Sequence, residues 1–374
     1  MRLLPALGTA AAVALVLTGC AGAGADPGAP GSTGTDGDRL RVVATTTQLA
    51  DVTRQIVGEE AEVTSLLQPG ASAHSFDPGP AALNALADAD LLVINGAGLE
   101  GWLDDTVEAS GFAGTVVDTS SELELIAADE DPHAGHDHAE HDHAEEGHEH
   151  AEEGHEHEHE HDEAGHEGHE HEHEHDEAGH EGHDHGEFDP HVWSDPANVI
   201  VQAEAIAAAL TEADPELDID ASASAYVERL EALEAWMRGS IEQVPVDERL
   251  VVTTHDTFGY LERAFDVQVV GTVLPSLDDS AEASAAHIDE LVAEIRETGT
   301  SVVFSESAID PQLAATIARE AGVELREGED ALAADALGPE GSDTATYIDS
   351  QIHNITAIVT AWGVEPLAVP ESLT

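Results

Sequence analysis

Eight short runs rich in β-branched residues recur along this 374-residue chain, and amphipathic helical patterns separate them. The runs are 41–47, 62–68, 91–98, 115–120, 249–255, 267–273, 301–307 and 323–329. Parallel strands need a crossover between them, usually a helix, so this alternation predicts parallel sheets covered by helices. Because the runs form two groups of four, we expect an α/β fold with two similar lobes, each of (β/α)4 type.

A long helix is predicted between the two groups of runs. Within residues 218–243 apolar residues recur at spacings of three and four, the pattern of one helix face. They are Tyr226, Leu230, Leu233, Trp236 and Met237. We expect this helix to join the lobes stiffly. The expected boundaries are a leader at 1–20, a flexible tether at 21–38, an N-terminal lobe at 39–215, a linking helix at 216–244 and a C-terminal lobe at 245–374.

The first twenty residues have the layout of a secretory signal peptide. Arg2 precedes an apolar run, and the segment ends in Leu-Thr-Gly-Cys at Cys20, the only cysteine. No disulfide can therefore form within the chain, and Cys20 resembles the lipid-modified cysteine of bacterial lipoproteins. No other apolar stretch reaches the roughly 18 residues that cross a bilayer. We expect an extracytoplasmic protein anchored to the cell membrane by a lipid on Cys20, with an ordinary signal peptide as the alternative.

The charge balance excludes one class of partner. The formal net charge is −68, with 79 acidic residues against 11 basic ones. Such a chain is repelled by the phosphates of nucleic acids, which bind proteins mainly through Lys and Arg. We therefore expect no nucleic-acid partner.

A tract rich in histidine and acidic residues interrupts the N-terminal lobe. It holds 19 of the 24 histidines in short repeats, such as HAEEGHEH at 143–150 and again at 150–157. Repeats this short cannot bury a core, so we expect a disordered surface loop over 129–187. Because the loop must become ordered to bind, we expect it to collect, buffer or sense zinc through weak sites. The expected accessory ligands are His155, His157, His159, His161, His169, His171, His173 and His175.

Three of the five remaining histidines occupy positions suited to metal binding. His74 follows the second strand run and His255 ends the fifth, and the carboxyl ends of parallel strands are where open α/β sheets bind ligands. His191 lies between prolines, before a helix that we expect to begin near Pro196 with Asp195 as its cap. Three imidazoles and one carboxylate form a ligand set that suits zinc. The sequence therefore predicts a metal site shared between separate elements.

The other two histidines have a structural explanation. His287 and His353 fall within helical patterns and have no strand-end partner nearby. A lone histidine of this kind is more often held by a hydrogen bond than by a metal. We expect both to be structural, with His353 hydrogen-bonded in the interior.

Six ordered motifs carry a family resemblance. They are HSFDP, NGAGLEGWL, DPHVWSDP, THDTFGYL, FSES and ADALGPEGSDTATYI. Together they resemble the ZnuA/TroA-like zinc and manganese solute-binding proteins of ABC importers, over residues 39–362 apart from the tract. The resemblance implies two lobes joined by a backbone helix, a metal ion in the cleft between them, and delivery of that ion to an ABC permease in the membrane. We expect a monomer and no enzymatic activity.

The resemblance also implies a ligand set. The family's histidine ligands match His74, His191 and His255, and its carboxylate ligand falls on Asp335, although Asp330 could align with the motif instead. Some zinc members use three histidines and a water. In manganese-binding members of the family, the third ligand position resembles a Glu. This chain has His255 at that position, and its imidazole favours zinc over manganese. We expect Glu306, in FSES, to lie outside the ligand set as a second-shell or structural residue.

Other functions stay open from the sequence. Three histidines and an activated water also describe a zinc hydrolase, although the chain lacks His-Glu-x-x-His and an obvious general base. A manganese-binding protein is a second alternative. A third is an extracellular zinc buffer or adhesin that works without a permease.

Overall fold

Each of the eight predicted runs overlaps a strand. The computed structural model describes residues 39–128, 187–279 and 281–374, and Arg39–Thr374 forms one unit. The expected leader and tether, with Cys20, and the tract at 129–186 lie outside the described residues. The strands are β1 (Leu40–Ala44), β2 (Ala61–Ser65), β3 (Leu91–Ile94), β4 (Thr115–Asp118), β5 (Leu250–Thr253), β6 (Gln268–Thr272), β7 (Val302–Phe304) and β8 (Glu324–Arg326).

The first four strands form one parallel sheet in the order β2-β1-β3-β4. In its register Val42 lies between Val63 and Leu91, and Val43, on the opposite face, lies between Thr64 and Leu92, so the sheet centre is β-branched or leucine on both faces. Buried runs of this kind are typical of parallel sheets covered by helices. The predicted α/β architecture is confirmed for this lobe.

The last four strands differ in detail from the expected four-stranded sheet. They form two parallel pairs, β5 with β6 and β7 with β8, and β5 packs beside β7. Just beyond the ends of β5 and β7, the backbone N–H groups of Thr254 and His255 donate to the side chain of Glu306, each at 2.9 Å. The Glu306 side chain thus joins the segments that follow β5 and β7, and the candidate site lies beside it.

Nine helices are present in the described residues. They are α1 (Thr47–Val57), α2 (Pro80–Ala87), α3 (Leu103–Ser110), α4 (Pro196–Ala213), α5 (Asp220–Ile241), α6 (Gly259–Phe265), α7 (Ala285–Thr298), α8 (Gln312–Ala321) and α9 (Tyr347–Ala361). Short 3-10 turns occur at η1 (Val192–Ser194), η2 (Val246–Glu248), η3 (Gly328–Asp330) and η4 (Glu371–Leu373). Asp195 caps α4 as predicted, because its side chain accepts from the N–H of Ala197.

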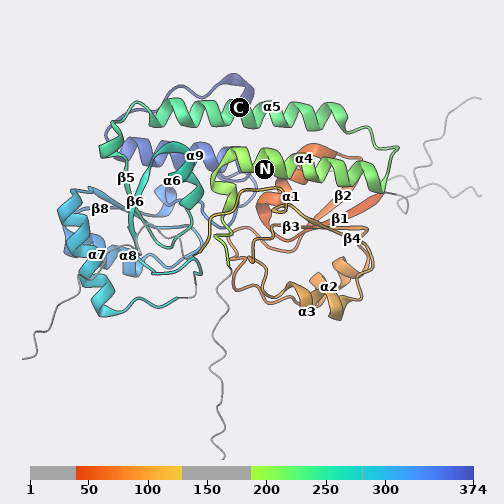
Figure 1. The fold of residues 1–374 in the computed structure, drawn as a ribbon, viewed down its shortest axis with the longest axis horizontal. Coiled ribbons are helices and arrows are strands. Elements are labelled where there is room, and N and C mark those ends of the chain that lie inside the picture. Colours follow the sequence, from red (N-terminus) through yellow and green to blue (C-terminus); the bar gives the residue numbers. More distant parts are fainter. Residues whose placement is uncertain (1–38, 129–186, 280) are drawn as a thin grey trace, which may run out of the picture. The chain divides into compact units, whose positions relative to one another are not determined.

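The long helix α5 packs on elements of both lobes. It buries the five apolar residues predicted for its inner face and contacts α1, α4 and α9. Figure 1 shows it running alongside α4 and α9. Its 22 residues correspond to about 33 Å at 1.5 Å per residue. The largest cluster of buried apolar side chains includes Val42 and Ile56, Leu230 of α5, and Val251 and Ile355. One apolar core therefore continues from one lobe into the other.

Among the residues that the structure describes, no helix combines the length and apolar character needed to cross a bilayer.

Candidate metal centre

The structure brings all four predicted ligands together. One potential ligand atom from each of His74, His191, His255 and Asp335 lies within 4.8 Å of the others. The Nε2 atoms of His74 and His191 are 3.1 Å apart, and Oδ2 of Asp335 lies 3.2 Å from Nε2 of His255. Atoms bound to one tetrahedral zinc at 2.0–2.2 Å are about 3.3–3.6 Å apart, so these separations suit a single ion.

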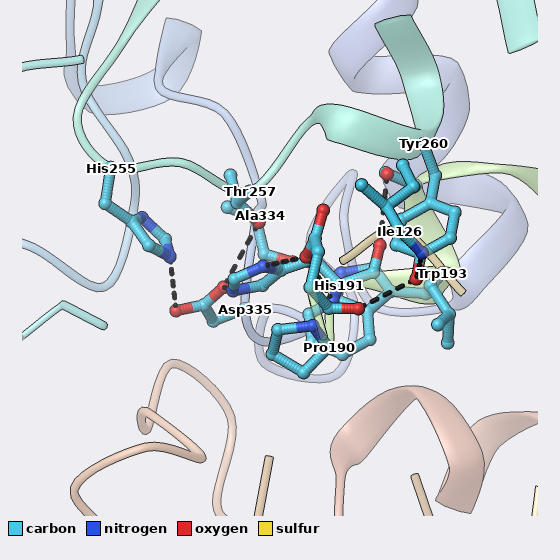
Figure 2. Close-up of polar contacts among 12 residues, drawn as sticks. Ile126, Pro190, His191, Trp193, His255, Thr257, Tyr260, Ala334 and Asp335 are labelled. Atoms are coloured by element: carbon cyan, nitrogen blue, oxygen red, sulfur yellow. Dashed lines mark hydrogen bonds and ion pairs between the residues drawn. The ribbon is translucent and has the colours of Figure 1, made fainter. Parts of the chain in front are cut away.

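The four side chains come from segments far apart in the sequence. His74 lies in the loop between β2 and α2, and His191 immediately precedes η1. His255 follows the end of β5 by two residues, and Asp335 lies between η3 and α9. Figure 2 shows the carboxylate of Asp335 facing the imidazole of His255, with His191 on its other side.

The structure separates Asp335 from the alternative Asp330. Asp330 lies in η3 at the surface, where its Oδ2 is 3.4 Å from Nη1 of Arg326. Asp335 is only 2% exposed and faces the histidines. Of the two carboxylates left open by the sequence, Asp335 is therefore the one placed to share an ion with the three imidazoles.

Two buried polar atoms at the centre, which face each other, make no hydrogen bond within the described part of the chain. They are Nε2 of His255 and Oδ2 of Asp335. A buried polar group without a hydrogen bond destabilises a fold by about 1–3 kcal/mol, and more when it is charged, so such atoms need a functional explanation. A nitrogen lone pair and a carboxylate oxygen aimed at the same point are the donors that a divalent cation takes up.

A carboxylate orients the ring of His255. Oε2 of Glu306 lies 2.6 Å from Nδ1 of His255 and keeps the proton on that nitrogen, which leaves Nε2 free for a metal. The backbone of Glu306 also forms a parallel β-bridge with that of Leu332, three residues before Asp335. The second-shell or structural role expected for Glu306 agrees with these contacts.

A second carboxylate, which the sequence analysis missed, orients His191. Oδ1 of Asp189 lies 2.8 Å from Nδ1 of His191 and accepts from its backbone N–H at 2.9 Å. The hydroxyl of Tyr260 in α6 donates to the carbonyl of Asp189 at 2.8 Å. The signal was present in the Asp-Pro-His motif, because an Asp commonly bonds the backbone two residues on.

The segment carrying Asp335 is held from both lobes. The carbonyl of Ala334 accepts from Nε1 of Trp193 at 2.9 Å, as Figure 2 shows, and the N–H of Leu337 donates to the hydroxyl of Thr47 at 2.8 Å. On the other side, Ala333 exchanges two hydrogen bonds with the side chain of Asn354 in α9. Asp335 is therefore held in place by its flanking residues before any ion binds.

The electrostatics of the centre favour a cation. Burial, together with the neighbouring His191, lowers the pKa of His74 to about 4, so this ring is neutral at physiological pH. Burial alone would lower the pKa of His255, but the carboxylates of Glu306 and Asp335 outweigh it and raise that pKa. Burial likewise opposes ionisation of Asp335, but His255 and the other imidazoles hold its pKa below the usual range. The carboxylate of Asp335 therefore stays ionised, and the ring of His74 beside it stays neutral.

The two remaining histidines of the described chain are elsewhere, as predicted. Nε2 of His287 lies 2.8 Å from the carbonyl of Thr272, and Nε2 of His353 lies 2.9 Å from the carbonyl of Ala331. Hydrogen bonds to the backbone thus account for both. The eight accessory histidines expected in the tract, from His155 to His175, lie outside the described residues.

Comparison with known proteins agrees with this geometry. The family described as "ZnuA: Zinc-uptake complex component A periplasmic" matches residues 42–361. The manganese-binding lipoprotein MntA of Halalkalibacterium halodurans is 28% identical over 352 residues, covering 93% of this chain and 94% of MntA. The zinc-binding lipoprotein AdcA of Streptococcus pneumoniae is 27% identical over 290 residues, covering 76% of this chain and 48% of AdcA.

A solved structure shows the same fold. The periplasmic zinc-binding protein TroA from Treponema pallidum superposes with a TM-score of 0.65 at 23% identity, covering 87% of this chain and 99% of that chain. The chain belongs to the ZnuA family, and it is a metal-binding, substrate-binding protein of an ABC transporter rather than an enzyme.

Proposed function

We propose that this protein captures Zn(II) at the metal centre formed by His74, His191, His255 and Asp335 and delivers it to an ABC permease. The zinc is cargo, so the protein needs only to bind and release it. One observation carries the proposal, namely the four donor atoms within 4.8 Å of one another, of which a nitrogen and an oxygen are buried and make no hydrogen bond within the described residues.

The donor set favours zinc over manganese. Three imidazoles and one carboxylate suit four-coordinate zinc, whereas manganese prefers oxygen ligands in an octahedral arrangement. The general order of affinities also places zinc above manganese at such a site. Manganese is the second candidate because relatives such as MntA carry a manganese-binding name at similar identity.

Metal analysis and calorimetry test the proposal. Protein purified without added metal should contain about one equivalent of zinc, and the stripped protein should bind one zinc tightly and manganese more weakly. His255→Ala removes one of four ligands and should abolish the tight site. His287→Ala removes a backbone-bonded histidine outside the centre and should bind zinc like the native protein. Tight binding that survives His255→Ala would contradict the proposed centre.

We further propose that the tract at 129–187 is an accessory zinc collector or sensor. Ordering a segment opposes binding by roughly 1–2 kcal/mol per residue fixed, whereas the centre is held by the fold beforehand. A variant with 129–186 replaced by a short Gly-Ser linker should lose several weak zinc sites and keep the tight one. Loss of the tight site in that variant would assign primary binding to the tract.

Membrane attachment and the permease belong to the same proposal. A lipid on Cys20 would place the protein on the extracytoplasmic face, and Cys20→Ser should release it into the soluble fraction. A deletion strain should grow poorly only when zinc is scarce, and plasmid-borne native protein should restore growth. Normal growth of that strain under zinc starvation would favour the buffer or adhesin alternative.

A further inference from the structure

The two oxygens of Asp335 have different surroundings. Oδ2 lies 3.2 Å from Nε2 of His255 and 3.9 Å from Nε2 of His74, and it has no hydrogen-bond partner within the described residues. Oδ1 faces the hydroxyl of Thr257, whose Oγ1 donates to it at 3.5 Å (Figure 2). Nε2 of His191 is farther from Oδ1, at 3.7 Å. The two oxygens thus differ in their neighbours: Oδ1 accepts from the Thr257 hydroxyl, whereas Oδ2 faces the imidazoles of His255 and His74.

Thr257 is well placed to hold Oδ1 of Asp335 in this orientation. It is 1% exposed, and it lies in the THDTFGYL motif between β5 and α6, two residues after His255. The backbone around Asp335 is fixed by the bonds of Ala333 and Ala334 described above. The carboxylate can therefore change its presentation only by rotating its own side chain. Contacts of Oδ1 decide whether one or both oxygens reach an ion.

We propose that the Thr257 hydroxyl is a specificity-determining group, which restricts Asp335 to one ligating oxygen and so favours zinc over manganese. This inference rests on the proposed function. With Oδ2 alone and three imidazoles the ion has four ligands, the number that zinc prefers. A second oxygen from the same carboxylate would supply a fifth ligand and approach the higher, oxygen-rich coordination that manganese prefers. Removing the hydroxyl leaves Oδ1 buried without its donor, and a metal ion is then its available partner.

Three substitutions separate this role from a general loss of packing. Thr257→Val keeps the side-chain volume and removes the hydroxyl, whereas Thr257→Ser keeps the hydroxyl. Thr53→Val removes an equally buried hydroxyl from α1, where it donates to the carbonyl of Leu49. The dissociation constants for zinc and manganese are measured for each variant by competition with a chromophoric chelator, using the full chain stripped of metal.

The expected result is a change in preference. Thr257→Val should lower the ratio of the manganese dissociation constant to the zinc dissociation constant about tenfold or more, so that the preference for zinc weakens. This is the usual size of an effect from a residue that contacts a metal ligand. Thr257→Ser and Thr53→Val should leave the ratio unchanged. Cobalt(II) reports the geometry independently, because its visible absorption is intense when four-coordinate and weak at higher coordination number. Cobalt-loaded Thr257→Val should lose that intensity, and cobalt-loaded Thr257→Ser should keep it.

The two dissociation constants and the cobalt spectrum distinguish a specificity role of Thr257 from a supporting role in the fold. If Thr257→Val binds both metals more weakly by the same factor and keeps an intense cobalt spectrum, Thr257 merely supports the fold and the specificity role is overturned. If Thr257→Val does not fold, Thr257→Ala gives the same comparison with less bulk beside the carboxylate. The proposed function is tested separately, by whether the native protein binds zinc tightly at all.

Discussion

Oε2 of Glu306 lies 2.6 Å from Nδ1 of His255, and both groups are buried. Oε1 of the same carboxylate accepts from the backbone N–H groups of Thr254 and His255. One side chain therefore fixes the position of the backbone after β5, the orientation of the ring and the nitrogen that carries the proton. The lone pair on Nε2 is aimed at the centre as a result.

Glu306→Gln should weaken zinc binding about 10–100-fold. The amide keeps the size of the side chain, but its NH2 group facing Nδ1 would favour the tautomer with the proton on Nε2, where it competes with the metal. Isothermal titration calorimetry measures the change. Glu324→Gln serves as the control, because Glu324 is paired with Arg326 at the surface. Equal zinc affinity in native protein and Glu306→Gln would show that the carboxylate does not set the tautomer.

Gly259→Ala should weaken zinc binding without weakening the fold. A Cβ at Gly259 would lie 2.7 Å from Oδ2 of Asp189, so that the carboxylate holding His191 must shift. Because Gly259 is the first residue of α6, alanine gains only part of the roughly 1 kcal/mol that it gains over glycine in a helix interior, and the unfolding free energy should change little. Gly101→Ala is the matched control, since its Cβ meets nothing within 4 Å. Chelator competition and urea unfolding give the two quantities, and parallel losses in both would contradict the argument.

Trp193→Phe should lower zinc affinity through Asp335. The substitution removes the indole N–H that donates to Ala334, and with it one restraint on the next residue. Trp236→Phe removes an equally buried indole donor, which bonds Leu367 away from the centre. Each variant should lose about 1–3 kcal/mol of unfolding free energy, but only Trp193→Phe should bind zinc more weakly. A similar zinc affinity in both variants would mean that the Asp335 segment is held well enough by Thr47 and Asn354.

The sequence predicted the parts of this protein that depend on local patterns. All eight strand runs, the inner face of α5 and the cap at Asp195 follow from periodicity and short-range chemistry. The three histidines were found because strand ends and prolines mark rigid positions. These are properties of segments of a few residues, which a single sequence displays directly.

The contacts that complete the centre depend on tertiary structure. Glu306 and His255 are 51 residues apart, and Trp193 and Ala334 are 141 apart, so no local pattern connects them. The choice between Asp330 and Asp335 likewise required the bonds on either side of Asp335, since both carboxylates lie in one connecting segment. The pairing of the last four strands as β5 with β6 and β7 with β8 is likewise a matter of tertiary structure, which strand propensity does not reveal.

Asp51 should make the stability of the metal-free protein depend on pH. Oδ2 of Asp51 in α1 accepts from the N–H of Tyr347 at the start of α9, and burial raises the pKa of this carboxyl above 3.8 despite that bond. As pH rises through 3.8 the unfolded chain releases this proton while the folded chain retains it, so this contribution to stability falls until the folded-state pKa is passed.

Asp51→Asn removes the titration and keeps an oxygen that can accept from Tyr347. The unfolding free energy of this variant minus that of the native protein should therefore increase with pH across the acidic range and then level off. Urea denaturation of metal-stripped protein from pH 3 upward measures the difference, and the other carboxylates cancel because both proteins share them. At the acidic end both residues are neutral, which sets the baseline. A difference that stays flat or decreases with pH would show that ionised Asp51 is stabilised by its contacts between α1 and α9.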